Sequence, residues 1–190
     1  MKRLMLFALS GTLILSSCGG SENNNEDNNN NEVVETPDFD GMNEMSLKEH
    51  GLNMTIMLPE VASSTGASIE PQIEHEDGDY LWHVLIGTRF HLVIEDFGKE
   101  KNKVADEKKR LADLNDIFVV EYLVEEPNLI MYKRTLHEDQ GGKKTYHCYG
   151  ETIVDGYTYV LRSQQDGSLK PIIDDMVKTI RSAKAIESAS

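Results

Sequence analysis

The chain has 190 residues, 39% of them hydrophobic, and its 33 Asp and Glu outnumber its 19 Lys and Arg, for a net charge of −14. This charge argues against a nucleic-acid partner, because most of the surface would repel a polyanion. Two cysteines cannot form a disulfide-dense scaffold, and the composition excludes a polytopic membrane protein. We expect one soluble acidic domain with appendages.

The first residues follow the pattern of a signal peptide. A basic head, Met1-Lys2-Arg3, precedes twelve largely apolar residues that run from Leu4 to Leu15. A membrane-spanning helix needs about 20 apolar residues, so this stretch is too short for a permanent anchor. Residues 1–17 are therefore expected to be absent from the mature protein.

The segment Leu15-Ser16-Ser17-Cys18 resembles the lipobox of bacterial lipoproteins. The resemblance implies that the Cys18 thiol receives a diacylglycerol, that fatty acids such as palmitate complete the anchor, and that Cys18 becomes the first mature residue. An ordinary secretory signal with a chance cysteine is the alternative. Gly19 is not the aspartate that resembles an inner-membrane retention signal in enteric bacteria, so we expect the outer membrane, with the side left open.

Residues 18–45 are expected to form an acylated cysteine and a disordered tether. Their composition is dominated by Asn, Glu, Asp, Ser and Gly, which cannot form a core. Acids without a single base keep the segment extended: Glu22, Glu26, Asp27, Glu32, Glu35, Asp38, Asp40 and Glu44. A surface-export signal is the functional alternative. Without Lys2 and Arg3 the mature chain has 17 bases against 33 acids, or −16, so it should stand off anionic headgroups.

Residues 46–186 carry the alternation and periodicity of a single domain. Strands are predicted at residues 52–59, 67–74, 80–86, 90–97, 117–125, 129–136, 144–154 and 157–163. The apolar spacing of residues 99–114 predicts an amphipathic helix, with Val104, Leu111 and Leu114 on its apolar stripe and Ala105 and Ala112 beside them. Ser168 is expected to cap a last helix, and its apolar face is Leu169, Ile172, Ile173, Met176, Val177 and Ile180.

This order of elements predicts an α+β domain, an antiparallel β-sheet flanked by amphipathic helices. The pattern resembles the PsbP-like fold, a superfamily of α/β/α sandwiches, from Leu52 to Ile180. The first long strand ends in Leu58-Pro59 and an amphipathic helix follows the central hairpin, as in that fold. Members mostly bind other proteins, so the resemblance implies a binding role without assigning any residue a function.

Two hairpin registers decide the orientation of the candidate ligand side chains. Asp155-Gly156 predicts a two-residue turn, which pairs Val154 with Tyr157 and directs Cys148 towards the core as an inert thiol. With Gly87-Thr88 as the other turn, His83 and His91 fall on opposite faces. The six histidines also lack His-x-x-x-His spacing, so no metal site and no cofactor are expected.

Two charged clusters remain as candidates for binding. The loop His75-Glu76-Asp77-Gly78-Asp79 concentrates acid, but it lacks the alternation of a calcium loop, so a solvated turn is expected. The basic residues of the first helix offer a possible surface for an anionic partner, on a helix that also carries Glu100, Asp106 and Glu107: they are Lys101, Lys103, Lys108, Lys109 and Arg110.

No catalytic motif is present in the sequence, so an enzyme is not expected. The first hypothesis is a lipid-anchored cell-envelope protein, a non-enzymatic module that binds an envelope protein or glycan. A small-molecule or metal-ion binding lipoprotein, with a pocket between the sheet and the helix that starts near Lys99, is the second. An enzyme of unrecognised class is the third. Perturbed pKa values clustered in a cleft would favour an enzyme, and convergent polar groups in a concave pocket would favour the second hypothesis.

Overall fold

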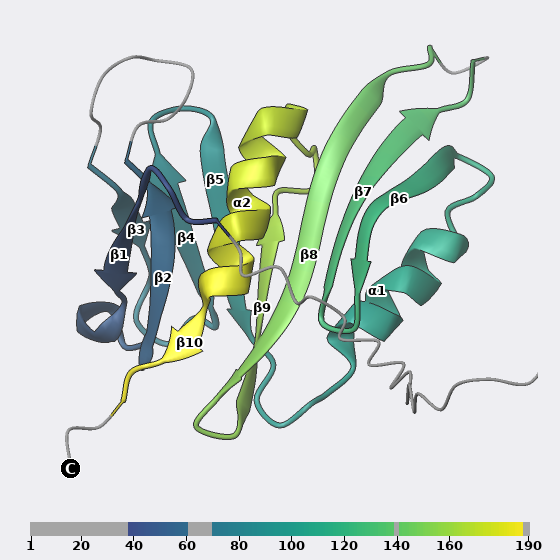
Figure 1. Cartoon of the computed structure of the whole chain (residues 1–190). Helices are drawn as coiled ribbons and strands as arrows, with labels where there is room; N and C mark the ends of the chain where they lie inside the picture. The colour runs from purple at the N-terminus through teal and green to yellow at the C-terminus, as the bar shows by residue number, and fades with distance from the viewer. Residues whose placement is uncertain (1–37, 61–69, 139–140, 188–190) are drawn as a thin grey trace, which may run out of the picture. The chain divides into compact units, whose positions relative to one another are not determined.

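The computed structural model describes residues 38–60, 70–138 and 141–187, which belong to one compact unit, Thr36–Ser190 (Figure 1). The expected signal peptide, Cys18 and most of the expected tether lie outside the described residues. The described part is dominated by antiparallel β-structure with two α-helices, as the α+β prediction requires. No helix in this part of the chain combines the length and the apolar character that crossing a bilayer demands.

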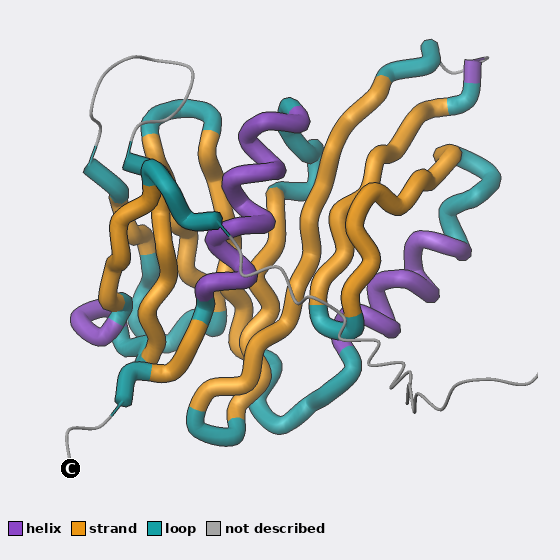
Figure 2. Tube along the Cα trace, viewed as in Figure 1, coloured by secondary structure: helices purple, strands orange, loops and turns teal. Residues whose placement is uncertain are grey.

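A seven-stranded antiparallel sheet with the order β3-β4-β5-β9-β8-β7-β6 forms the frame. Figure 2 colours the strands orange. Two sets of consecutive strands, β3 to β5 and β6 to β9, meet where β5 pairs with β9. The bounds are β3 Gln72–Glu74, β4 Leu81–Ile86, β5 Phe90–Asp96, β6 Phe118–Glu126, β7 Leu129–Leu136, β8 Lys144–Val154 and β9 Tyr157–Ser163.

A second, three-stranded sheet has the order β1-β2-β10, with β1 at Met42–Ser46, β2 at Met54–Pro59 and β10 at Lys184–Ala185. A short 3-10 helix, η1 (Lys48–His50), joins β1 to β2. The tether was expected to continue to residue 45, and β1 corrects this boundary. β1 is an edge strand that pairs with β2, and Met42 is its one buried residue. Its composition is therefore mostly polar, which does not indicate a strand.

The main core lies between the seven-stranded sheet on one side and the smaller sheet with α2 (Lys170–Ser182) on the other. Helix α2 contacts β2, and Figure 1 shows the two in front of the large sheet. The predicted face of α2 is confirmed as buried from Ile172 to Ile180. The predicted cap is wrong: Ser168 pairs its backbone with Tyr146, and Leu169 holds the cap position with 60% of its surface exposed.

Helix α1 (Lys103–Ala112) covers the opposite face of the large sheet. Neighbouring residues of a strand point to opposite faces. Met131 on β7 joins the main core with α2, whereas Ile130 and Tyr132 form a second cluster with Val104 and Leu111 of α1. The seven-stranded sheet is therefore flanked by one helix on each face, and α1 is shorter than the predicted residues 99–114.

The two hairpin registers had different outcomes. Val154 pairs with Tyr157 as predicted, and Cys148 is buried. In the other hairpin Ile86 pairs with Phe90, which leaves a three-residue loop between them. His83 and His91 then lie on the same face of the sheet, so the prediction that they face apart is wrong. This register places the alternating apolar residues of both strands on the inner face: Trp82, Val84, Ile86, Phe90, Leu92 and Ile94.

Candidate functional site

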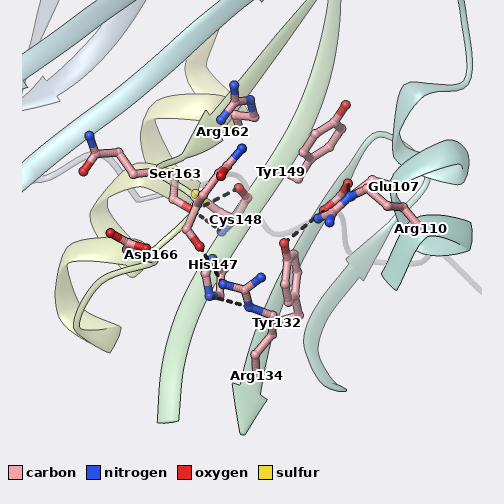
Figure 3. A pocket seen from close by; sticks show the side chains of 12 residues that line it. Glu107, Arg110, Tyr132, Arg134, His147, Cys148, Tyr149, Arg162, Ser163 and Asp166 are labelled. Carbon is pink, nitrogen blue, oxygen red and sulfur yellow. Dashed lines mark hydrogen bonds and ion pairs between the residues drawn. The ribbon is translucent and has the colours of Figure 1, made fainter. Parts of the chain in front are cut away.

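A pocket of about 440 Å³ lies on the α1 side of the large sheet. Side chains from α1, β7, β8 and β9 converge on it, together with the turn of residues 164–166 that follows β9 (Figure 3). Its charged lining is three arginines and two acids: Arg110, Arg134, Arg162, Glu107 and Asp166. The pocket is thus locally basic in a chain whose net charge is −14.

One wall of the pocket is built on a buried carboxylate. Glu107 of α1 is only 7% exposed and accepts hydrogen bonds from Arg110 Nε (2.7 Å), Arg110 Nη2 (2.6 Å) and the Tyr132 hydroxyl (3.0 Å). Burial and the charge of Glu107 raise the pKa of Tyr132, so its phenol stays protonated. Arg110 thus balances the charge of the Glu107 carboxylate within the wall of the pocket.

The sequence contained a signal for this wall that we missed. Glu107 lies three residues after Val104 and four before Leu111, which places it on the buried stripe of α1. A charged residue at a core position needs a partner, and here Arg110 and Tyr132 provide it.

His147 of β8 forms the floor, 2% exposed and stacked on Tyr132 with ring centroids 5.2 Å apart. Its Nε2 accepts a hydrogen bond from Arg134 Nε at 3.0 Å. The same nitrogen lies 2.9 Å from Thr145 Oγ1, so the threonine hydroxyl must also be a donor. Burial, and then the charge of Arg134, lowers the pKa of His147 to about 3, so the imidazole is neutral at pH 7.

Arg134 of β7 is held from three directions. Its Nε bonds to His147, its Nη2 donates to the carbonyl oxygen of Gln165, and its guanidinium lies over the Phe118 ring at 4.8 Å. Both hydrogen-bond acceptors are neutral. No carboxylate among the described residues forms an ion pair with Arg134, so its positive charge is positioned without being compensated.

The opposite side of the pocket carries Arg162 of β9. Its Nε and Nη2 each lie 3.3 Å from Glu95 Oε2, a longer contact than the Arg110–Glu107 pair. A second hollow of about 320 Å³ adjoins the pocket and shares Arg162 and residues 164–166 with it. Tyr149 of β8 also lines the first pocket, and none of the described residues offers its hydroxyl a hydrogen bond.

The corrected register of β4 and β5 brings two histidines together beside the second hollow. His83 Nδ1 and His91 Nε2 are 2.8 Å apart, and the two rings meet edge to face. Burial and the neighbouring His83 lower the pKa of His91, with Glu74 acting in the opposite direction. Within residues 38–60, 70–138 and 141–187, no cluster of three or more His, Cys, Asp or Glu has the geometry to hold a metal ion.

The predicted basic surface divides into paired and unpaired members. Lys103 pairs with Glu100 and Asp106, and Lys108 pairs with Glu125. Arg110 alone of the five faces the pocket. Lys101 and Lys109 are exposed and have no ion-pair partner in the described part of the chain.

The remaining candidates have structural surroundings. His75 of the acidic loop stacks on Trp82 at 4.4 Å, and its Nδ1 lies 2.9 Å from the Leu81 carbonyl oxygen. The loop closes through a turn in which Asp79 N donates to the Glu76 carbonyl oxygen. Cys148 is buried as predicted, and burial raises the pKa of its thiol to about 12.

Comparison with known proteins gives no relative from which a role could be transferred. No protein-family model matches the chain, and no curated protein matches it. The geometry of the pocket is therefore the basis for a functional argument.

Proposed function

We propose that this protein is a lipid-anchored component of a bacterial cell envelope, attached to the outer membrane through Cys18. The support is the sequence of the first 45 residues: a basic head, a short apolar stretch, the lipobox-like Leu-Ser-Ser-Cys and an acidic segment without bases. Two or three acyl chains, at about 0.8 kcal/mol per buried methylene, are enough for stable anchoring. The domain then needs no membrane-binding surface of its own.

We also propose that the domain belongs with the PsbP-like α/β/α sandwiches. The support is the arrangement of helices on both faces of one antiparallel sheet, with the β2 strand ending in Leu58-Pro59. Folds of this kind serve many functions, so the site must carry the functional argument.

The domain acts as a non-enzymatic binding module, and its ligand is a small polar molecule that enters the pocket between α1 and the sheet. One observation carries this proposal: a concave pocket of about 440 Å³ in which three arginines, two tyrosines and two glutamines converge. Binding sites for small molecules combine a preformed hollow with a few fixed polar groups. The hypothesis of a small-molecule binding lipoprotein expects a pocket between the sheet and this helix.

The pKa values of Tyr132 and His147 are perturbed, which is also a feature of enzyme active sites. Their hydrogen bonds argue against a catalytic role. A general base must offer a free lone pair to the proton it removes. His147 Nε2 already accepts from Arg134 and Thr145, and the Tyr132 hydroxyl already donates to Glu107. These groups are committed to partners within the wall, which suits a rigid binding surface.

The test is a thermal-shift screen of the mature chain against charged and neutral small molecules. Gln165→Trp places a large ring at the exposed edge of the pocket and leaves the Gln165 carbonyl that Arg134 uses. Lys109→Trp, on an exposed part of α1 outside the pocket lining, is the matched control. Compounds that stabilise the wild type and Lys109→Trp should lose their effect on Gln165→Trp. A screen without binders, or binders indifferent to Gln165→Trp, contradicts the proposal.

A further inference from the structure

We propose that the pocket recognises an oxyanion, the carboxylate or phosphate group of its ligand, and that Arg134 supplies the principal positive charge. This inference rests on the proposed binding function and names the ligand chemistry. It depends on three features of the pocket: a positioned and uncompensated arginine, a saturated buried acid, and further free donors on the opposite side.

The first feature is the state of Arg134. A guanidinium has five N–H donors, and the contacts to His147 and Gln165 use two of them, which leaves three for a ligand. The planar fork of arginine fits two oxygens of one carboxylate or phosphate. Phe118 against its face and His147 at its Nε fix the plane of that fork before the ligand arrives.

The neutral imidazole of His147 explains why the positive charge of Arg134 stays available to a ligand. A carboxylate in the position of His147 would orient Arg134 equally well but would cancel its charge. His147 orients the guanidinium as a neutral acceptor, so it is a positioning residue. An anion that binds Arg134 therefore displaces no internal carboxylate.

None of the described acids near the pocket forms an ion pair with Arg134. Glu107 is occupied by Arg110 and Tyr132, and Glu95 is occupied by Arg162. Asp166 lies at the rim and forms no ion pair with a described residue. The distant acids that give the chain its charge of −14 are screened over about 8 Å at physiological ionic strength, so the groups inside the pocket decide its local charge. Among the three arginines there, Arg110 and Arg162 are paired with acids and Arg134 is not.

The opposite side supplies secondary donors. Arg162 holds Glu95 through long contacts of 3.3 Å, so its outer N–H groups can turn towards a ligand at small cost. The Tyr149 hydroxyl has no hydrogen-bond partner among the described residues and lines the same pocket. A ligand with an oxyanion at Arg134 can thus extend a polar group towards Arg162 and Tyr149.

The experiment is an NMR titration of the ¹⁵N-labelled mature chain, residues 18–190, prepared as Cys18→Ala. Sodium phosphate and sodium acetate are compared with sodium chloride at constant ionic strength. We expect saturable shifts at Arg134 Nε–H and at the amides of residues 164–166 with phosphate or acetate, and none with chloride. The stronger of the two identifies the preferred oxyanion.

Three variants locate the binding. Arg134→Gln should weaken binding by about tenfold or more, because a charge-assisted pair of hydrogen bonds is lost. Arg134→Lys keeps the charge and should weaken binding less, which separates charge from folding. Lys109→Gln removes a charge outside the pocket lining and should leave binding unchanged.

Four results would overturn the inference. One is an effect of chloride equal to that of phosphate and acetate, and another is binding unchanged in Arg134→Gln. A third is a neutral compound that binds in a manner sensitive to Gln165→Trp while neither anion competes with it. This third result leaves the binding function intact and rejects only the oxyanion. The fourth, a pocket that binds nothing, rejects both.

Discussion

His147 shows how one buried residue links stability to function. It is neutral, it stacks on Tyr132, and it accepts the Nε–H of Arg134. Because its pKa is lowered to about 3 in the folded state, against about 6.5 when unfolded, the unfolded chain binds the extra proton between those values. The neutral His147 therefore contributes its full stabilisation to the folded state above pH 6.5. The free energy of unfolding falls as the pH is lowered from 6.5 towards 3.

We predict that His147→Gln flattens the pH dependence of stability. In the wild type this histidine should lower the free energy of unfolding by about 1.4 kcal/mol for each pH unit between roughly 6 and 4. A glutamine can still accept a hydrogen bond from Arg134 but does not titrate. Urea unfolding at pH 4, 5, 6 and 7 measures both slopes, and equal slopes would mean that His147 is protonated in the folded state.

At the level of elements, the packing of α2 on the sheet depends on Gly150 of β8. A Cβ at this position would lie 2.4 Å from Ile180 Cγ2 and 3.1 Å from Leu129 Cδ1. The absence of a side chain lets the helix approach the strand closely. This contact fixes the inner face of β8, and so the direction in which His147 and Tyr149 point on the other face.

Gly150→Ala should therefore destabilise the protein by about 1–3 kcal/mol through overpacking. Ile180→Ala removes the methyl group that the new Cβ would meet. The double variant Gly150→Ala/Ile180→Ala should lose less stability than the sum of the two single variants. Denaturant unfolding of all four proteins gives the coupling, and strict additivity would show that α2 does not rest on Gly150.

The sequence predicted those elements whose signals were local. Asp155-Gly156 placed the turn between β8 and β9 and the burial of Cys148, and the apolar spacing from Ile172 to Ile180 placed α2. The predicted β4–β5 register is wrong because Gly87-Thr88 alone indicates a two-residue turn. The even-numbered apolar residues of both strands already required a loop with an odd number of residues.

The pocket depended on information that the sequence does not carry locally. Arg134, His147 and Glu107 come from three different elements, and only the order of strands brings them together. A lone histidine beside a cysteine in a strand gives no sign of its partner. Glu107 on the apolar stripe of α1 was the one readable signal, because a buried carboxylate needs a partner, which here is the exposed Arg110.

At the scale of the whole molecule, the proposed anchor at Cys18 is separate from the proposed binding site in the folded domain. In our proposal a lipid at Cys18 holds the protein at the membrane, and the folded domain binds the ligand. The strongly negative surface would keep that domain away from anionic headgroups, while the basic pocket remains a local exception.

The N-terminus of the protein purified from the membranes of its own host provides the most direct test of this account. Mass spectrometry of the N-terminal fragment should find that the chain begins at Cys18 and that its sulfur carries a diacylglyceryl group. A free Cys18 thiol, or a chain that retains residues 1–17, would contradict the account.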